Sequence, residues 1–264
     1  PEKIPLVQTI IISLIIIIKR KIYFKMKNLA TAIFASVVTL ASISCSKKNI
    51  TGEGPLVTQS RNASGFNEID LQMYGNVYYK NDPESKLEIV AQQNVLDILE
   101  TYVSGTKLII KFKSGYDYHS SEDIRIYVSG PHVNNFVLTT SGSIYALNRI
   151  DATSIYVRSE GSGSFSLVEA NAVSIEAIAK GSGDITINSG NVFSEKLKTV
   201  GSGKVNLMGV SARTVYAQTS GSGYIKTKVS DHLDAKIEGS GSIYYFGFPS
   251  LSSHVSGSGR LIRL

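Results

Sequence analysis

The carboxylates and histidines are the side chains that acid–base or metal chemistry would require. When the chain is aligned on its repeated Gly-Ser-Gly triads, Asp184 lies opposite Lys204 and Glu176 lies opposite Lys196. Opposite charges on neighbouring strands form ordinary cross-strand pairs, each of them weak in solvent. The four histidines are scattered and lack metal-ligand spacing: His119, His132, His232 and His254. We therefore predict no catalytic residue, no metal site and no cofactor.

Aromatic side chains are better candidates for a contact surface. Six of them are predicted to face outward or to lie in a shortened turn: Tyr156, Tyr216, Tyr224, Tyr244, Phe246 and Phe248. Tyrosine among Ser, Asn and Lys is common in surfaces that bind glycans or proteins. Aromatic residues also favour strands in general, which is the purely structural alternative. Residues 244–249 have two interpretations, a cap over the end of the core or an exposed platform for a sugar ring or a protein partner.

The cysteine at position 45 is the only one in the chain. It follows a charged start at Met26-Lys27-Asn28, an apolar run over 29–43 and small residues at 42–44. This order is typical of a secretory signal, and a cysteine at the cleavage point indicates a bacterial lipoprotein. We predict a signal peptide over 26–44 and a membrane anchor on lipidated Cys45. The alternative is an incidental cysteine after an ordinary signal peptide.

Two further segments flank the predicted signal. Residues 1–25 precede the first methionine and are interpreted as a translated upstream segment. Their apolar stretch over 4–18 is short for a membrane helix, although a short hydrophobic anchor is the alternative. Residues 45–60 are polar and contain Gly and Pro, which predicts a flexible tether.

The positive charge of the chain is concentrated in this leader. The whole chain has 27 basic and 21 acidic residues, and residues 1–44 contain six basic residues and one acidic residue. The remainder therefore has 21 basic and 20 acidic residues, a net charge of +1. Such a balance gives no reason to expect a nucleic-acid partner.

The Gly-Ser-Gly triads reveal the elements that must position these side chains. Six triads occur between residues 161 and 259 at steps of 20, 20, 20, 18 and 18, and Ser141-Gly142-Ser143 is a weaker copy. A repeat of this length fits one coil of a parallel β-solenoid, with the triad as a tight corner. Apolar and polar residues alternate on both sides of each triad, as in half-buried strands. We predict about seven coils of 18–21 residues over 131–264, with the two shorter steps losing residues from the return turn.

One inward row breaks the apolar rule. The position six residues before each triad is occupied by Ile155, Ile175, Glu195, Val215, Leu233 and Leu251.

The segment 61–130 has the same β character without the regular repeat, and it is predicted to cap the solenoid. Strand-like runs cover 68–73, 76–80, 86–91, 107–113 and 123–128, and 93–102 is a candidate short helix. Its segments, in order, are Arg61-x4-Phe66-x2-Ile69, Gly75-Asn76-Val77, Lys86-Leu87-Glu88-Ile89, Asn94-Val95-Leu96 and Gly105-Thr106-Lys107-Leu108-Ile109-Ile110. Followed by the triads, they resemble the head GIN domain family of putative auto-transporter adhesins, common in Bacteroidetes. The resemblance covers 61–264 and implies a secreted or lipid-anchored β-helical protein with an adhesive role and no agreed catalytic residues.

These observations favour a lipid-anchored, non-enzymatic outer-membrane protein that acts as a surface adhesin or ligand-contact module. Its expected partners are the membrane, through Cys45, and a glycan or protein ligand. The alternative is a periplasm-facing structural or envelope-maintenance lipoprotein. Acidic residues after the lipidated cysteine often mark lipoproteins for surface export, and their absence from Ser46-Lys47-Lys48 favours this alternative. A polysaccharide-acting β-helical enzyme is the third hypothesis.

Overall fold

The fold was obtained as a computed structural model, which describes residues 48–118 and 123–264. The predicted upstream segment, signal peptide and lipidation site at Cys45 lie outside the described residues, as does His119. Residues 48–264 form one compact unit. Strands account for 71% of the described residues and helix for 2%, which confirms the all-β fold class.

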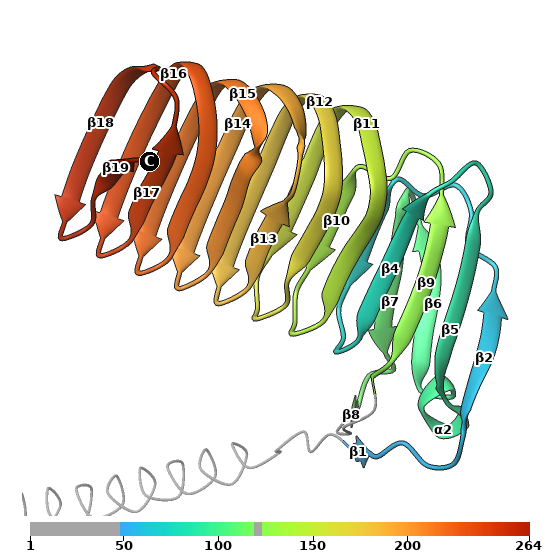
Figure 1. The fold of residues 1–264 in the computed structure, drawn as a ribbon. Helices are drawn as coiled ribbons and strands as arrows, with labels where there is room; N and C mark the ends of the chain where they lie inside the picture. Colours follow the sequence, from blue (N-terminus) through green and yellow to red (C-terminus); the bar gives the residue numbers. More distant parts are fainter. Residues whose placement is uncertain (1–47, 119–122) are drawn as a thin grey trace, which may run out of the picture. The chain divides into compact units, whose positions relative to one another are not determined.

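Seventeen of the described strands form one continuous sheet that wraps around the core, and its two opposite walls are called the post-triad sheet and the pre-triad sheet below (Figure 1). The post-triad sheet contains the strands that follow the triads. Its neighbours, in spatial order, are β2 (Leu56–Arg61), β5 (Lys86–Gln92), β9 (Arg125–Gly130), β4 (Asn76–Asn81), the first parts of β11 (Ser143–Ser159) and β12 (Phe165–Gly181), β13 (Asp184–Ile187), the first parts of β15 (Lys204–Gly221) and β16 (Tyr224–Gly239), β17 (Ser242–Phe246) and β19 (Leu261–Arg263).

The pre-triad sheet contains the strands that lead into the triads. In spatial order it consists of β6 (Leu99–Ser104), β7 (Lys107–Phe112), β3 (Glu68–Leu71), β10 (Asn135–Leu138), the second parts of β11 and β12, β14 (Gly190–Gly201), the second parts of β15 and β16, and β18 (Ser250–Gly257). A separate short pair joins β1 (Lys48–Ile50) to β8 (Tyr116–Tyr118). Every pairing from β10 onward is parallel, as the repeat predicted.

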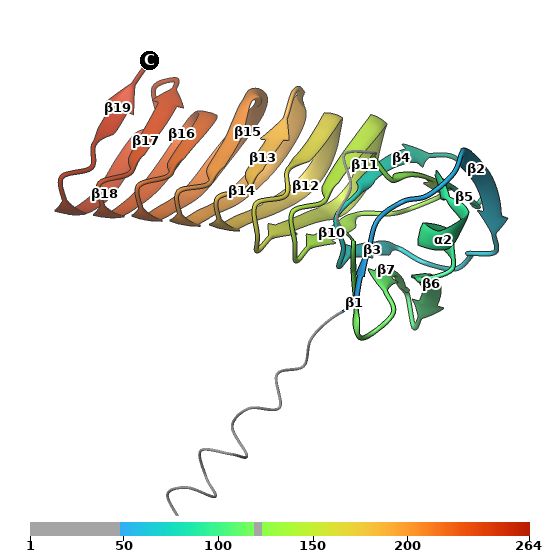
Figure 2. The same cartoon turned by 90° about the horizontal axis from the view of Figure 1, so that it is seen from below.

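The seven corners bound about six complete turns, slightly fewer than the seven coils expected from the sequence. Seen from below in Figure 2, the corners follow one another along one edge of the stack. The opposite edge carries wider return arcs (Figure 1). In the pairing of β15 with β16, the register shifts only within the return arc, between Leu207 and Thr214. The two residues missing from the shorter coils are therefore lost there, as predicted.

The backbone geometry of the corners explains why glycine occupies these positions in the repeat. At the triad 201–203, the amides of Ser202 and Gly203 both donate to the carbonyl oxygen of Gly181 in the preceding coil, at 2.9 Å each. Gly201 has φ +107°, a conformation that L-residues other than glycine rarely adopt. The hydroxyls of Ser202 and Ser222 lie 3.1 Å apart, so the middle serine bonds to its copy in the next coil.

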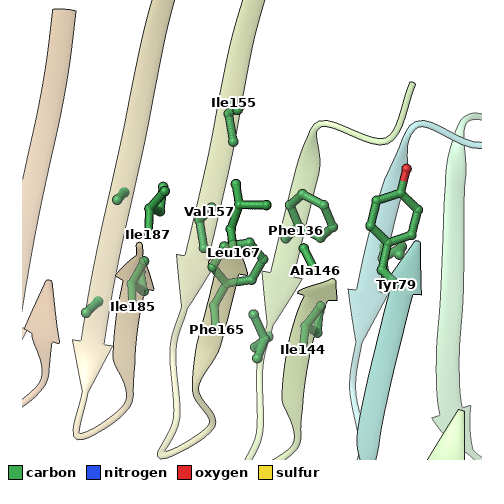
Figure 3. Close-up of a cluster of buried hydrophobic side chains, with 14 of the residues drawn as sticks. Tyr79, Phe136, Ile144, Ala146, Ile155, Val157, Phe165, Leu167, Ile185 and Ile187 are labelled. Atoms are coloured by element: carbon green, nitrogen blue, oxygen red, sulfur yellow. The ribbon is translucent and has the colours of Figure 1, made fainter. Parts of the chain in front are cut away.

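The core is a continuous column of apolar side chains between the two sheets. Figure 3 shows Ile185 and Ile187 projecting inward beside Val157 and Leu167. Aromatic rings fill the column near the cap, where the Phe136 and Phe165 centroids are 4.9 Å apart. Burial of stacked aliphatic and aromatic surface is the main stabilising term, since the described chain has no disulfide.

The segment before the repeats closes the N-terminal ends of both sheets with antiparallel strands. β5 pairs antiparallel with β9 in one sheet, and β6 pairs antiparallel with β7 in the other. The expected helix over 93–102 is wrong in its extent, because α2 (Gln93–Leu96) is a single turn. Residues from Leu99 onward instead form β6, whose backbone pairs with β7.

Arg61, part of the sequence pattern noted above, holds this closure together. Its guanidinium donates to the carbonyl oxygens of Leu99 at 2.7 Å and Leu96 at 3.0 Å. We expect Arg61→Ala to lower the free energy of unfolding of residues 48–264 by about 2 kcal/mol in urea titrations, because hydrogen bonds from a charged donor are lost. Arg149→Ala, which removes an exposed pair with Asp151, is the matched control and should cost under about 1 kcal/mol. Equal losses would contradict this role.

One interpretation of residues 244–249 was that they cover the end of the core, and the exposure of two of their rings does not fit it. Tyr245 is buried, but Phe246 is 50% and Phe248 is 82% exposed, so these two rings do not cover the end of the core. Leu251, at an inward position of the repeat, is half exposed because β18 has a described neighbour on one side, β16, and none on the other. Among the described residues, no helix is long and apolar enough to span a membrane.

Candidate functional site

The outer face of the pre-triad sheet carries a groove that joins two of the predicted aromatic residues. Strand register places Tyr156, Glu176, Lys196, Tyr216 and Asp234 in one row across five neighbouring strands. A second row of hydroxyl-bearing residues lies beside it: Ser154, Ser174, Ser194 and Thr214, followed by His232. Together they line an open groove of about 620 Å³. We call it the Tyr156–Tyr216 groove.

Two phenol rings and a central ion pair give this groove its chemistry. Tyr156 and Tyr216 are three strand spacings apart, about 14 Å at the usual separation of paired strands. Between them, the Lys196 ammonium lies 2.8 Å from a Glu176 oxygen. The hydrogen bond to this carboxylate raises the pKa of Lys196, so its ammonium group stays charged at neutral pH. The surface offers rings for apolar contact and alternating donors and acceptors between them, as required to bind a polyhydroxylated chain.

The structure places Tyr224 and Tyr244 elsewhere, on the post-triad sheet. Their rings meet edge to face with centroids 5.9 Å apart. The ammonium of Lys226 lies over both rings, at 5.2 Å and 5.6 Å from the centroids, and Lys204 lies over Tyr224 at 5.7 Å. These lysines already occupy faces of both rings, which makes the pair a poorer stacking surface than the Tyr156–Tyr216 groove.

Phe246 and Phe248 occupy a third location, on the return arcs. The six aromatic candidates are therefore divided among two sheets and one edge. Tyr156 and Tyr216 share a groove, Tyr224 and Tyr244 form a pair, and the two phenylalanines border a second groove on the arcs.

Sequence reasoning missed a stack of three tyrosines near the cap. The ring of Tyr78 lies between those of Tyr127 and Tyr145, with centroid separations of 5.3 Å and 5.4 Å. The strands β9, β4 and β11 bring them together. Only Tyr145 lies in the regular repeat, so the alignment of triads contained no signal for this stack.

The charged pairs have the arrangement expected from the alignment. The Lys204 ammonium is 3.6 Å from a carboxylate oxygen of Asp184, and both side chains are about half exposed. Within 48–118 and 123–264, no group of three His, Cys, Asp or Glu residues is placed to hold a metal ion. Burial raises the pKa of Glu195 to about 8, but the side chain is only 2% exposed and lies in the core. A carboxyl group without access to solvent cannot act as an acid or base on a bound substrate.

Comparison with known proteins identifies the family. The profile of the family described as putative auto-transporter adhesin, head GIN domain, matches residues 65–249. A crystal structure of a putative adhesin from Bacteroides fragilis superimposes with a TM-score of 0.78 at 22% identity, covering 81% of this chain and 100% of that one. A putative lipid binding protein from Parabacteroides distasonis gives 0.69 at 24% identity, covering 82% and 100%. Similarity at this identity shows a shared fold, and no curated protein matches the chain.

Proposed function

Because the chain belongs to the head GIN domain family of putative auto-transporter adhesins, we propose that it is a non-enzymatic contact module of the cell envelope that binds a glycan through the Tyr156–Tyr216 groove. The observation that carries the proposal is the groove itself, where two tyrosines flank a row of Ser and Thr hydroxyls and the Glu176–Lys196 pair. Sugar rings present apolar faces and hydroxyl edges, and this arrangement provides a partner for each. A protein ligand is the alternative occupant.

Binding measurements on residues 48–264 test this site. We expect Tyr156→Ala/Tyr216→Ala to weaken binding to a glycan-array hit by about 10- to 100-fold, since each lost aromatic contact is worth about 0.5–1.5 kcal/mol. The matched control is Tyr224→Ala/Tyr244→Ala, which removes two tyrosines from the other sheet. Both variants should keep the unfolding midpoint of the wild type within a few tenths of a molar of urea. Equal loss of binding in both, or in neither, would reject the groove as the site.

The proposal also covers the cellular location of the protein. We propose that Cys45 carries lipid and holds the domain at the outer membrane. Metabolic labelling with an alkyne fatty acid should mark the wild type and not Cys45→Ser. Protease treatment of intact cells then separates the two envelope hypotheses, because digestion of the domain supports a surface adhesin. Protection until the outer membrane is broken supports the periplasm-facing structural lipoprotein instead.

A further inference from the structure

The most exposed apolar side chains of the solenoid, apart from those on the edge strand β18 and at position 264, gather on the return arcs. Each of them is 45% exposed or more: Leu147, Val168, Val173, Phe193, Phe246 and Phe248. They come from β11, β12, β14, β17 and the segment after β17, while the arcs within β15 and β16, which lie between β14 and β17 in the stack, carry Arg213, Lys228 and Asp231 instead. We call this edge the return-arc ridge; it is the edge opposite the Gly-Ser-Gly corners in Figure 1. A group of exposed apolar side chains gathered on one edge and interspersed with charged residues is typical of an interaction surface.

The ridge is hollowed where the three phenylalanines lie. A groove of about 730 Å³ is bordered by Phe193, Phe246 and Phe248. Its floor is a row of stacked small apolar residues in strand register: Ala172, Val192, Ala212 and Val229. The floor is therefore apolar, and water lacks side-chain partners along that row, while the rest of the lining combines the three phenyl rings with polar and charged residues: Asn191, Ser211, Arg213, Lys228 and Ser230.

Cationic side chains accompany these rings. The guanidinium of Arg263 lies 4.1 Å from the centroid of Phe248, and that of Arg213 lies 5.4 Å from the centroid of Phe193. Lys228 lies opposite Phe246 in the pairing of β16 with β17 and also lines the groove. Asp231 is paired with Arg213 at 2.8 Å. Apolar rings beside cations form the pattern of side chains that enter a bilayer interface while their charged neighbours contact lipid phosphates.

We propose that the return-arc ridge is a membrane-contact surface for anionic phospholipid. Phe193, Phe246 and Phe248 enter the boundary between headgroups and acyl chains, and Arg213, Lys228 and Arg263 bind the phosphates. The extent of the ridge favours a bilayer over a small ligand, because its residues extend over five strand spacings, about 24 Å. This surface is independent of the Tyr156–Tyr216 groove and of any lipid on Cys45.

Vesicle sedimentation tests the surface. Residues 48–264, which form a unit of their own, should sediment with vesicles of equal parts phosphatidylglycerol and phosphatidylcholine, and more weakly with phosphatidylcholine alone. Phe193→Ser/Phe246→Ser/Phe248→Ser should weaken binding at least about tenfold. Lys228→Glu/Arg263→Glu should abolish the preference for phosphatidylglycerol. Tyr156→Ala/Tyr216→Ala should bind vesicles like the wild type, so that failure of the glycan site and failure of this surface are distinguishable.

The chain contains no tryptophan, so the emission of a single introduced tryptophan reports which position contacts the membrane. We expect the emission of Phe248→Trp to shift to the blue on addition of the mixed vesicles and to be quenched by brominated acyl chains, while Tyr156→Trp shows neither effect. Each of three outcomes would overturn the proposal: no shift for Phe248→Trp, equal shifts at both positions, or vesicle binding unchanged in the triple serine variant. If size-exclusion chromatography shows a dimer of the wild type and a monomer of the triple serine variant, a second copy of the chain covers the ridge instead.

Discussion

Gly223→Ala is expected to destabilise the solenoid by about 3 kcal/mol, although it adds a single methyl group. A Cβ at this position would lie 2.1 Å from the carbonyl oxygen of Gly203 in the preceding coil, closer than real Cβ atoms come to any neighbour. The atom in the way belongs to the backbone, so it cannot rotate aside. Relief requires the two corners to separate, which lengthens the 2.9 Å bonds from Ser222 and Gly223 to Gly201. Urea unfolding of residues 48–264 should show the loss as a lower midpoint.

Two controls separate this contact from other effects of mutating a turn. Ser222→Ala removes an exposed hydroxyl 3.1 Å from that of Ser202, and it should cost under about 1 kcal/mol. Gly105→Ala, at φ +63° with no atom within 4 Å of the new Cβ, reports backbone strain alone and should cost about 1–2 kcal/mol. If Gly223→Ala is as stable as Ser222→Ala, close stacking of the corners is not what requires glycine.

The regular part of this structure is predictable because one register governs every coil. Parallel strands that pair in register place residues twenty positions apart side by side, so aligning the triads also aligned Tyr156, Glu176, Lys196 and Tyr216. The ion pair in the groove follows from the same alignment.

Features of the return arcs and of the cap could not be predicted, because these segments depart from the 18–20-residue repeat. Within the return arcs the alternation that identifies outward positions is interrupted: Val192 and Glu195, three positions apart, are both buried. The exposure of Phe193 and Val173 was therefore missed. Most strands of the cap were predicted, but their pairing was not, because β4 and β9 pair across a long irregular segment. The stacking of Tyr78 on Tyr127 therefore had no sequence signal.

Contacts across the core form a third class. The alignment fixes neighbours within one sheet, but it does not specify which inward residues of the two sheets meet. Thr227, on the post-triad sheet, donates its hydroxyl to Oε2 of Glu195 at 2.6 Å. Both side chains are buried, and they replace apolar residues of their rows, Ile175 and Val215 on one side and Leu207 on the other. This polar pair inside an apolar column is the origin of the second large effect.

The stability of the domain should fall as the pH rises from about 5 to 8, because of Glu195. Burial raises the pKa of its carboxyl group from 4.5 to about 8, and the hydrogen bond from Thr227 opposes this only in part. Between these values the folded state holds a proton that the unfolded state has released. Unfolding is therefore favoured as the pH rises, by about 1.4 kcal/mol per pH unit for this one group. Its contribution is fully present below about pH 4.5 and lost above about pH 8.

Two variants separate the effect of Glu195 on stability from the effects of all other titrating groups. Glu195→Gln keeps the shape and one acceptor but cannot ionise, so its stability should lack this descending limb when urea midpoints are compared across the pH range. Glu195→Leu/Thr227→Val removes both polar partners, and replacing a buried polar pair by apolar groups of similar shape avoids leaving either one unsatisfied. At pH 8 we expect the double variant to exceed the wild type by roughly 4 kcal/mol. Well below pH 4.5 the two should be nearly equal, because the carboxyl group is then protonated in both the folded and the unfolded wild type. A wild-type pH profile that coincides with that of Glu195→Gln would mean that the carboxyl group ionises without cost, and that the core at this coil admits water.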